Sequence, residues 1–146
     1  MSTAVAHPEY LSYRTKRLYL LICQRIGDAL KPYGLGRSQW QVIARLARSG
    51  TLAQRELQQA MQIESATLTC IVDTLAAKGW IERAESSTDR RVKMLLLTSA
   101  GRERMSTIPD PYEVVEHRML EAIADEDRAQ TQRVLEAMIR NLEDRS

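Results

Sequence analysis

The sequence predicts a mainly α-helical fold with one small β-hairpin. Two observations predict it. Apolar residues recur at helical spacing through most of the 146 residues, and a polar, turn-forming segment separates two strand-like runs near the middle. A hydrophobic content of 44% is sufficient for the core of one domain, although the chain has no phenylalanine. No apolar run approaches the roughly 18 residues of a membrane span, so we expect no membrane partner.

The N-terminal third is expected to be helical. A long helix is predicted over residues 10–31, where apolar residues keep helical spacing until Pro32 ends it. A second helix is expected to begin at Ser38, a good N-cap with Gln41 three residues later as its capping-box partner. A short helix should then cover residues 53–61.

Residues 64–78 predict a helix with two contrasting faces. The apolar residues fall at i, i+3, i+4, i+7 and i+8, the pattern of a helix packed on a core: Leu68, Ile71, Val72, Leu75 and Ala76. The opposite face carries small, mostly polar side chains: Ser65, Ala66, Thr67, Thr69, Cys70 and Asp73. Such side chains have little bulk, so this face can approach a groove closely.

A hairpin is expected after this helix, with strands over residues 80–84 and 92–98. The polar segment between the strands contains the adjacent Arg90 and Arg91. Two arginines at a hairpin tip have no packing role, but they can reach a phosphate backbone or a minor groove. The hairpin therefore favours binding to a polyanion.

The C-terminal third is expected to form interrupted helices. A helix capped by Thr98 or Ser99 should break at Pro109 and Pro111, because proline removes a backbone donor and clashes with the preceding turn. A last helix over residues 126–143 is expected to bury its apolar residues: Val134, Leu135, Met138, Ile139 and Leu142. The terminal helices are too amphipathic for loops and too few to close a core, which favours packing against a second copy of the chain.

Charge is distributed unevenly along the chain. Residues 1–104 hold 16 Lys and Arg against 9 Asp and Glu, whereas residues 105–146 hold 5 against 10. A basic body suits a domain that meets a polyanion on one side. Two cysteines form no disulfide framework and residues 1–8 lack a signal-peptide pattern, so a reducing cytoplasm is the expected location.

No enzyme is expected. The sequence lacks a phosphate loop, an HExxH motif, a CxxC pair and a Ser-His-Asp order with supporting glycines. Glu113 and His117 lie one helical turn apart, but no cysteine or further histidine accompanies them, so we expect a surface pair. We therefore expect no metal site and no cofactor.

A distinctive sequence pattern lies in the middle of the chain: residues 57–83, which contain KGWIER at 78–83, are followed by DRR at 89–91 and LT at 97–98. This pattern resembles the winged helix-turn-helix of the MarR family, closest to its MarR and SlyA branch. The resemblance covers roughly residues 35 to 104. It implies that the chain divides into three parts: an N-terminal dimerisation helix over 1–34, a DNA-binding winged helix-turn-helix lobe over 35–100, and C-terminal dimerisation helices over 101–146. A homodimer would place two recognition helices in major grooves about 34 Å apart.

The resemblance assigns candidate DNA contacts. The groove-facing candidates lie on the helix over residues 64–78: Ser65, Ala66, Thr67, Thr69 and Cys70. Relatives commonly have arginine where this chain has Cys70, and a thiol cannot make the bidentate contact of arginine with guanine. Direct readout is therefore expected to be weaker there. Residues near helix starts are candidates for backbone contact: Arg37, Gln54 and Arg55.

The hairpin supplies the remaining DNA candidates. Arg90 is the leading one, with the minor groove as its expected target. Arg91 either shares this contact or pairs with Asp89 and fixes the hairpin. Asp89 itself is expected to be structural, because a carboxylate that faces phosphates would be repelled.

The family commonly binds small aromatic acids or phenolic compounds in a crevice between the dimer helices and the DNA-binding lobe. Trp40 either lines such a crevice or belongs to the core. The arginines that bind a carboxylate in some relatives are replaced here by Leu20 and Cys23, although Arg17 or Arg25 can substitute. Cys23 is expected to be a buried, inert thiol, since a redox switch needs an exposed thiolate of low pKa.

Together these observations predict a cytoplasmic, homodimeric, sequence-specific transcriptional regulator. It is expected to bind pseudo-palindromic double-stranded DNA, more often as a repressor, and to be released by a small aromatic ligand. Two alternatives remain open. One is a regulator of the same fold that senses redox state through a cysteine, and the other is a winged-helix module that binds proteins and not DNA.

Overall fold

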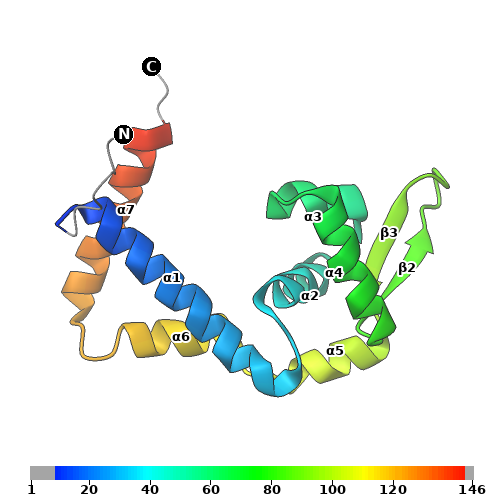
Figure 1. The fold of residues 1–146 in the computed structure, drawn as a ribbon, viewed down its shortest axis with the longest axis horizontal. Coiled ribbons are helices and arrows are strands. Elements are labelled where there is room, and N and C mark those ends of the chain that lie inside the picture. The colour runs from blue at the N-terminus through cyan, green and yellow to red at the C-terminus, as the bar shows by residue number, and fades with distance from the viewer. Residues whose placement is uncertain (1–8, 144–146) are drawn as a thin grey trace, which may run out of the picture. The chain divides into compact units, whose positions relative to one another are not determined.

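The computed structural model describes residues 9–143, which form helices and one small sheet (Figure 1). The elements follow in chain order: α1 (Leu11–Leu30), a 3-10 turn η1 (Lys31–Tyr33), α2 (Arg37–Ser49), β1 (Thr51–Ala53), α3 (Gln54–Met61), α4 (Ser65–Ala77), β2 (Ile81–Glu85), β3 (Lys93–Leu97), α5 (Ser99–Ser106), α6 (Pro111–Met119) and α7 (Asp125–Glu143). The expectation about a signal peptide concerns residues 1–8, which lie outside the described part. Within that part, none of the helices has the length and apolar character to cross a membrane.

The chain divides into two compact units, residues 1–111 and residues 112–146. The first unit holds α1 to α5 and the sheet, and the second holds α7 and nearly all of α6. The predicted mainly α-helical fold with a small β part is confirmed.

The sheet has three strands, not the two of a simple hairpin. It is antiparallel in the order β1-β3-β2, with Thr51 opposite Leu96 and Ile81 opposite Leu97. The sequence analysis missed β1 because three residues are too few to show an alternating pattern, and pairing with β3 is what makes them a strand. Strand β3 therefore has β1 as a second hydrogen-bonded neighbour, which holds the hairpin to the rest of the unit.

The core of the first unit lies between α1, α2, α3, α4 and the sheet. The predicted inner face of α4 is confirmed for Leu68, Val72 and Leu75, which are completely buried, whereas Ile71 and Ala76 are half-buried. The other buried hydrophobic residues of this unit come from α1, α2, α3, β2, β3 and the connecting segments: Ile26, Leu30, Leu35, Trp40, Val42, Ile43, Leu46, Leu57, Trp80, Ile81, Leu95, Leu97 and Ile108. This core fixes the position of α4 relative to the β-hairpin.

The start of α2 differs from the prediction. The helix begins at Arg37, and Gly36 is its N-cap. The Gly36 N–H donates to Gln39 Oε1 at 3.0 Å, so the glutamine that caps the helix is Gln39 and not Gln41. Ser38 lies inside the helix because the N-cap is two residues earlier than the serine-based pattern predicts.

Helix α5 is joined closely to the end of α4. Thr98 caps α5 as predicted: its hydroxyl accepts from the Gly101 N–H at 2.9 Å and donates to the Gly79 carbonyl at 2.6 Å. A Cβ on Gly101 would lie 2.2 Å from the Trp80 carbonyl oxygen, so the two backbones are in direct contact. The Arg104 guanidinium lies over the Trp80 ring, 5.4 Å from its centroid.

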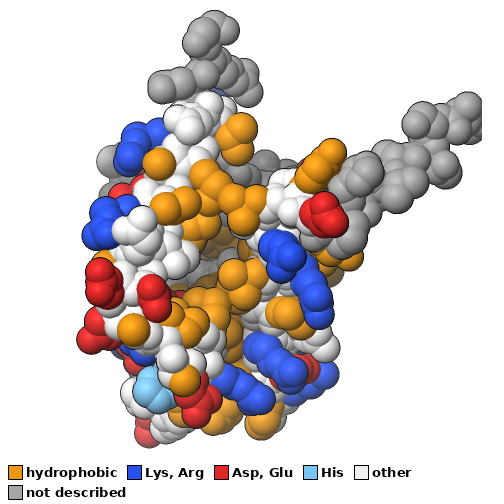
Figure 2. All heavy atoms as spheres, turned by 90° about the vertical axis from the view of Figure 1, so that its left-hand side faces the viewer, with side chains coloured by type: hydrophobic (Ala, Val, Ile, Leu, Met, Phe, Trp, Pro, Cys, Tyr) orange, Lys and Arg blue, Asp and Glu red, His pale blue; other side chains and the backbone are white. Residues whose placement is uncertain are grey.

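The predicted break at the prolines is confirmed, since α5 ends at Ser106 and α6 begins at Pro111. The prediction that the last helix buries its apolar face is wrong for a single chain. Ile139 is 54% exposed and Leu142 is 85% exposed, and α7 has no buried residue. Figure 2 shows such exposed hydrophobic side chains in orange on one face of the molecule. Within residues 9–143, α7 therefore leaves much of its apolar face exposed.

Candidate nucleic-acid interface

Helices α3 and α4 are connected by a tight turn. The turn contains Gln62 at φ +52°, a left-handed conformation that ends α3 in the way glycine often does. The core contacts of Leu68 and Val72 then fix which side of α4 faces solvent. The predicted outer residues are all exposed: Ser65, Ala66, Thr67, Thr69, Cys70 and Asp73.

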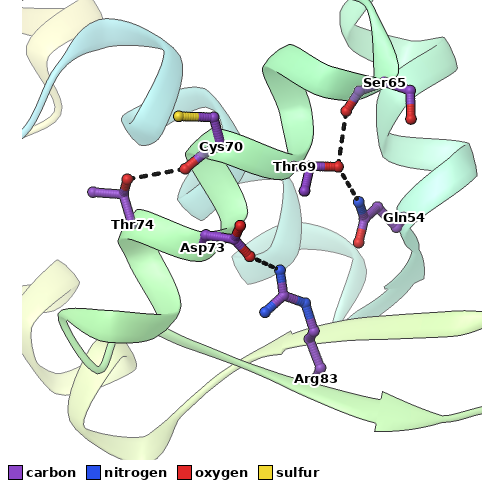
Figure 3. A network of polar contacts seen from close by, with 7 residues as sticks. All are labelled: Gln54, Ser65, Thr69, Cys70, Asp73, Thr74 and Arg83. Atoms are coloured by element: carbon purple, nitrogen blue, oxygen red, sulfur yellow. Dashed lines mark hydrogen bonds and ion pairs between the residues drawn. The ribbon is translucent and has the colours of Figure 1, made fainter.

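Three of the predicted contact residues are joined by hydrogen bonds. The Thr69 hydroxyl donates to the Ser65 carbonyl at 2.9 Å and accepts from Gln54 Nε2 at 3.3 Å (Figure 3). Gln54 Oε1 is buried and has no hydrogen-bond partner among the described residues. Gln54, the first residue of α3, is therefore attached to α4 through its amide nitrogen.

An ion pair connects α4 to the β-hairpin. Arg83 Nη2 on β2 donates to Asp73 Oδ1 on the exposed face of α4 (Figure 3). Asp73 is the only acidic residue of α4, so this pair neutralises the one carboxylate on a surface that we expected to approach phosphates. The sequence analysis placed Asp73 on the outer face of this helix but missed its pairing with Arg83, because the two residues come together only through the turn at Gly79.

The tip of the hairpin is shaped by Asp89. Its carboxylate accepts from the Arg91 N–H at 2.9 Å, and its carbonyl accepts from the Val92 N–H at 3.0 Å. The Arg91 contact with Asp89 therefore uses the backbone and not the guanidinium. Arg90 and Arg91 are exposed, and within residues 9–143 neither guanidinium forms an ion pair.

The remaining backbone-contact candidates lie at helix starts. Arg55 is exposed on α3 beside Gln54, whereas Arg37 is half-buried as the first residue of α2. Within the described part of the chain, neither forms a hydrogen bond or ion pair with α4 or with the hairpin.

The predicted ligand residues do not line one pocket. Arg17 lies in an open groove on α1 with Tyr13, Lys16, Leu20, Leu21 and Gln24. Neither Cys23, which is half-buried, nor Trp40, which is 2% exposed, lines this groove. Trp40 is therefore part of the core in this structure.

The second unit offers a shallow groove lined by Glu113, Glu116, His117, Leu120, Glu121, Ala122 and Arg128. Among residues 9–143, no group of three or more His, Cys, Asp or Glu side chains could hold a metal ion.

Arg128 donates to the carbonyls of Leu120 and Ile123 at 2.7 and 2.8 Å. It thereby fixes the turn between α6 and α7, including Ala122 at φ +59°.

Two helices joined by a tight turn, followed by an antiparallel hairpin with an exposed basic tip, define a winged helix-turn-helix protein. The sequence model of the MarR family matches residues 35–93. The winged helix-turn-helix part of the chain therefore matches the MarR family. This match agrees with the expectation that the protein is a regulator and not an enzyme.

Individual relatives agree with this match. The chain is 28% identical over 119 residues to the uncharacterized HTH-type transcriptional regulator YwoH of Bacillus subtilis, covering 82% of this chain and 86% of that protein. It is 27% identical over 116 residues to the transcriptional repressor MprA of Escherichia coli, covering 78% of this chain and 66% of that protein.

A solved structure has the same fold. A mutant MarR from Escherichia coli complexed with operator DNA is similar with a TM-score of 0.75 and 18% identity, over 88% of this chain and 92% of that one.

Proposed function

We propose that the protein is a sequence-specific, DNA-binding transcriptional regulator. In this proposal α4 is the recognition helix in the major groove, and the wing, defined as β2, β3 and the loop 86–92, contacts the DNA backbone or the minor groove. The observation that carries it is that the small-residue face of α4 and the basic wing belong to one rigidly joined surface. The Arg83–Asp73 pair and the packed core hold the two parts in a fixed relation.

The DNA contacts proposed for individual residues follow from this arrangement. Arg90 and Arg91 have no carboxylate partner and are available for phosphates. The unpaired N–H groups at an α-helix N-terminus favour a phosphate near Ser65, and Gln54 and Arg55 begin α3 beside it. Arg37 is a further candidate for backbone contact.

The test is DNA binding measured against salt concentration. A duplex from the region upstream of the coding sequence should bind more tightly than a shuffled duplex of equal length. With about six phosphate contacts, affinity should fall with a log–log slope of about −5 as salt rises. A flat salt response, or equal affinity for both duplexes, would favour a winged-helix module that binds protein and not DNA.

The active form is proposed to be a homodimer. The support is the apolar surface that one chain leaves uncovered. In α7 it includes Val134, Leu135, Ile139 and Leu142, and in α1 it includes Leu11, Leu18 and Tyr19, all between 41% and 85% exposed. Apolar surface of this extent on a soluble protein marks an interaction site, and a second copy would extend the small second unit into a larger core.

The dimer is tested by mass in solution. Light scattering after gel filtration should give twice the mass of 16.6 kDa. Ile139→Glu should give single chains with weak operator binding, because a charge would be buried without a partner, whereas the matched control Gln132→Glu on the same helix should remain dimeric. A wild-type protein that stays single at micromolar concentration would contradict the homodimer.

We further propose that a small aromatic ligand releases the protein from DNA. The support is the open groove on α1, where Lys16 and Arg17 lie beside the aromatic ring of Tyr13 and the apolar Leu20. Benzoate and phenol are suitable probes, because a ligand that binds only the folded state raises the melting temperature. Benzoate should stabilise the wild-type protein more than Arg17→Ala, and equal shifts would exclude Arg17.

Repression is proposed as the direction of control, by analogy with the repressor MprA. A reporter under the upstream region should be more active when the gene is deleted. The action would take place in the cytoplasm, where bacterial DNA lies. No observation favours the redox alternative: Cys23 and Cys70 are free thiols, one half-buried and the other exposed.

A further inference from the structure

Helix α4 carries no side chain that can form a bidentate hydrogen bond with a base. Its sequence from Ser65 to Ala77 contains no arginine, lysine, asparagine or glutamine. These are the residues whose paired contacts distinguish guanine and adenine in the major groove. If α4 enters the groove, as in the proposed function on which this inference rests, base selection must come from another kind of contact.

The hydroxyl of Thr69 is already engaged within the protein. It donates its single proton to the Ser65 carbonyl at 2.9 Å and accepts from Gln54 Nε2 at 3.3 Å (Figure 3). A threonine hydroxyl has only one proton, so it cannot donate to a base acceptor without giving up the bond to Ser65. The methyl group of this exposed side chain, in contrast, takes part in no hydrogen bond and remains available for contact.

Ser65 and Thr67 have hydroxyls that form no hydrogen bond within residues 9–143, and these can contact DNA. A single hydroxyl, however, gives little selectivity. Guanine, adenine and thymine each present an acceptor in the major groove, and a hydroxyl can donate to any of them. We expect these hydroxyls to position α4 on the duplex but not to choose a base.

The methyl groups are the selective feature that remains. Ala66 and Thr69 are separated by three residues and lie on the same exposed side of α4. The C5 methyl of thymine is the only apolar group that an unmodified base pair presents in the major groove. We infer that α4 selects thymine through contact of the Ala66 and Thr69 methyl groups with thymine C5 methyls, so that each half-site carries thymines opposite the first turns of α4.

Deoxyuridine provides a direct test, because it differs from thymidine only by the missing C5 methyl. A preferred site is first selected from a random duplex library, and each thymine of a half-site is then replaced in turn. At the contacted thymines the affinity should fall about fourfold, the effect of about one methyl(ene) group removed from an apolar contact. Elsewhere in the site it should not change.

The outcomes separate this inference from the proposed function. If a preferred site is selected but every deoxyuridine replacement leaves its affinity unchanged, thymine-methyl recognition is overturned and DNA binding stands. If the selection returns no preferred sequence at all, sequence-specific binding fails and this inference fails with it.

Two variants at one position separate the methyl from the hydroxyl. Thr69→Ser keeps the hydroxyl and removes the methyl. The ratio of its affinity for the thymine site to its affinity for the deoxyuridine site should therefore fall to about one at the base pair that residue 69 contacts. Thr69→Val keeps methyl groups and removes the hydroxyl, so it should retain the ratio. A ratio is insensitive to the fraction of protein that is folded. The reverse result, with the ratio kept in Thr69→Ser and lost in Thr69→Val, would overturn the inference.

Discussion

The exposed face of α4 and the tip of the wing differ sharply in charge. On α4 the only charged residue of the helix, Asp73, is neutralised by Arg83, and small neutral side chains surround it. The wing tip carries Arg90 and Arg91 without ion-pair partners within residues 9–143. Phosphate contacts supply affinity and base contacts supply specificity. In this molecule the two properties therefore belong to different elements and should respond separately to mutation.

Adding charge to α4 should have the largest effect. Cys70→Arg introduces the paired donors that contact guanine O6 and N7, worth about 1–3 kcal/mol of discrimination. Selection from a random library should then return sites with a guanine opposite residue 70, and Cys70→Ser is the matched control without such donors. Unchanged preferred sites for Cys70→Arg would show that this position does not face base edges.

Removing charge from the wing should lower affinity without changing the preferred site. Arg90→Ala should weaken binding about eightfold near 0.1 M salt and reduce the salt slope by about 0.9, the effect of losing one phosphate contact. Arg90→Lys should retain the slope, and Arg118→Ala, an exposed arginine on α6, serves as a control for overall charge. A loss of affinity confined to certain sequences would mean that Arg90 contributes to base selection.

The shape of the wing should matter less than its charge. Asp89→Ala removes the acceptor for the Arg91 N–H, at a cost of about 1 kcal/mol for one hydrogen bond. We expect faster amide exchange in the loop 86–92 and a few-fold lower affinity. Asp89→Asn keeps a side-chain oxygen and should behave like the wild type, so a defect in Asp89→Asn as large as that of Asp89→Ala would point to a role for the charge.

The smallest effect is expected from removing the Arg83–Asp73 ion pair that connects the two regions, and it is measured as a change in stability. A double-mutant cycle with Asp73→Ala and Arg83→Ala, followed by urea unfolding, should give a coupling energy of about 0.2–1 kcal/mol. The value is small because the two side chains are 60% and 35% exposed, and water screens the pair. A coupling energy of zero would show that packing alone holds the wing against α4.

Helix periodicity predicted the features that depend on local sequence. The burial of Leu68, Val72 and Leu75 follows from their spacing, and the break before Pro111 follows from proline chemistry. The exposure of the small residues on α4 was predicted for the same reason. The DNA-contact roles of these residues remain predictions.

Features that depend on contacts distant in the chain were not predicted. Strand β1 exists only through its pairing with β3, and the Arg83–Asp73 pair forms only after the turn at Gly79. The bond from Gln54 to Thr69 likewise joins two helices whose relative position the sequence pattern does not define. The burial expected for α7 was wrong for one chain, because an amphipathic pattern shows that a helix has a partner without showing which molecule provides it.

The contact between Gly101 and the Trp80 carbonyl limits which substitutions this lineage can accept. Any other side chain at residue 101 would begin with a Cβ 2.2 Å from a backbone oxygen, and backbone cannot rotate aside as a side chain can. A deep mutational scan should therefore recover glycine alone at this position. Gly101→Ala, on a helix that carries none of the proposed DNA contacts, should therefore lower the melting temperature of the protein.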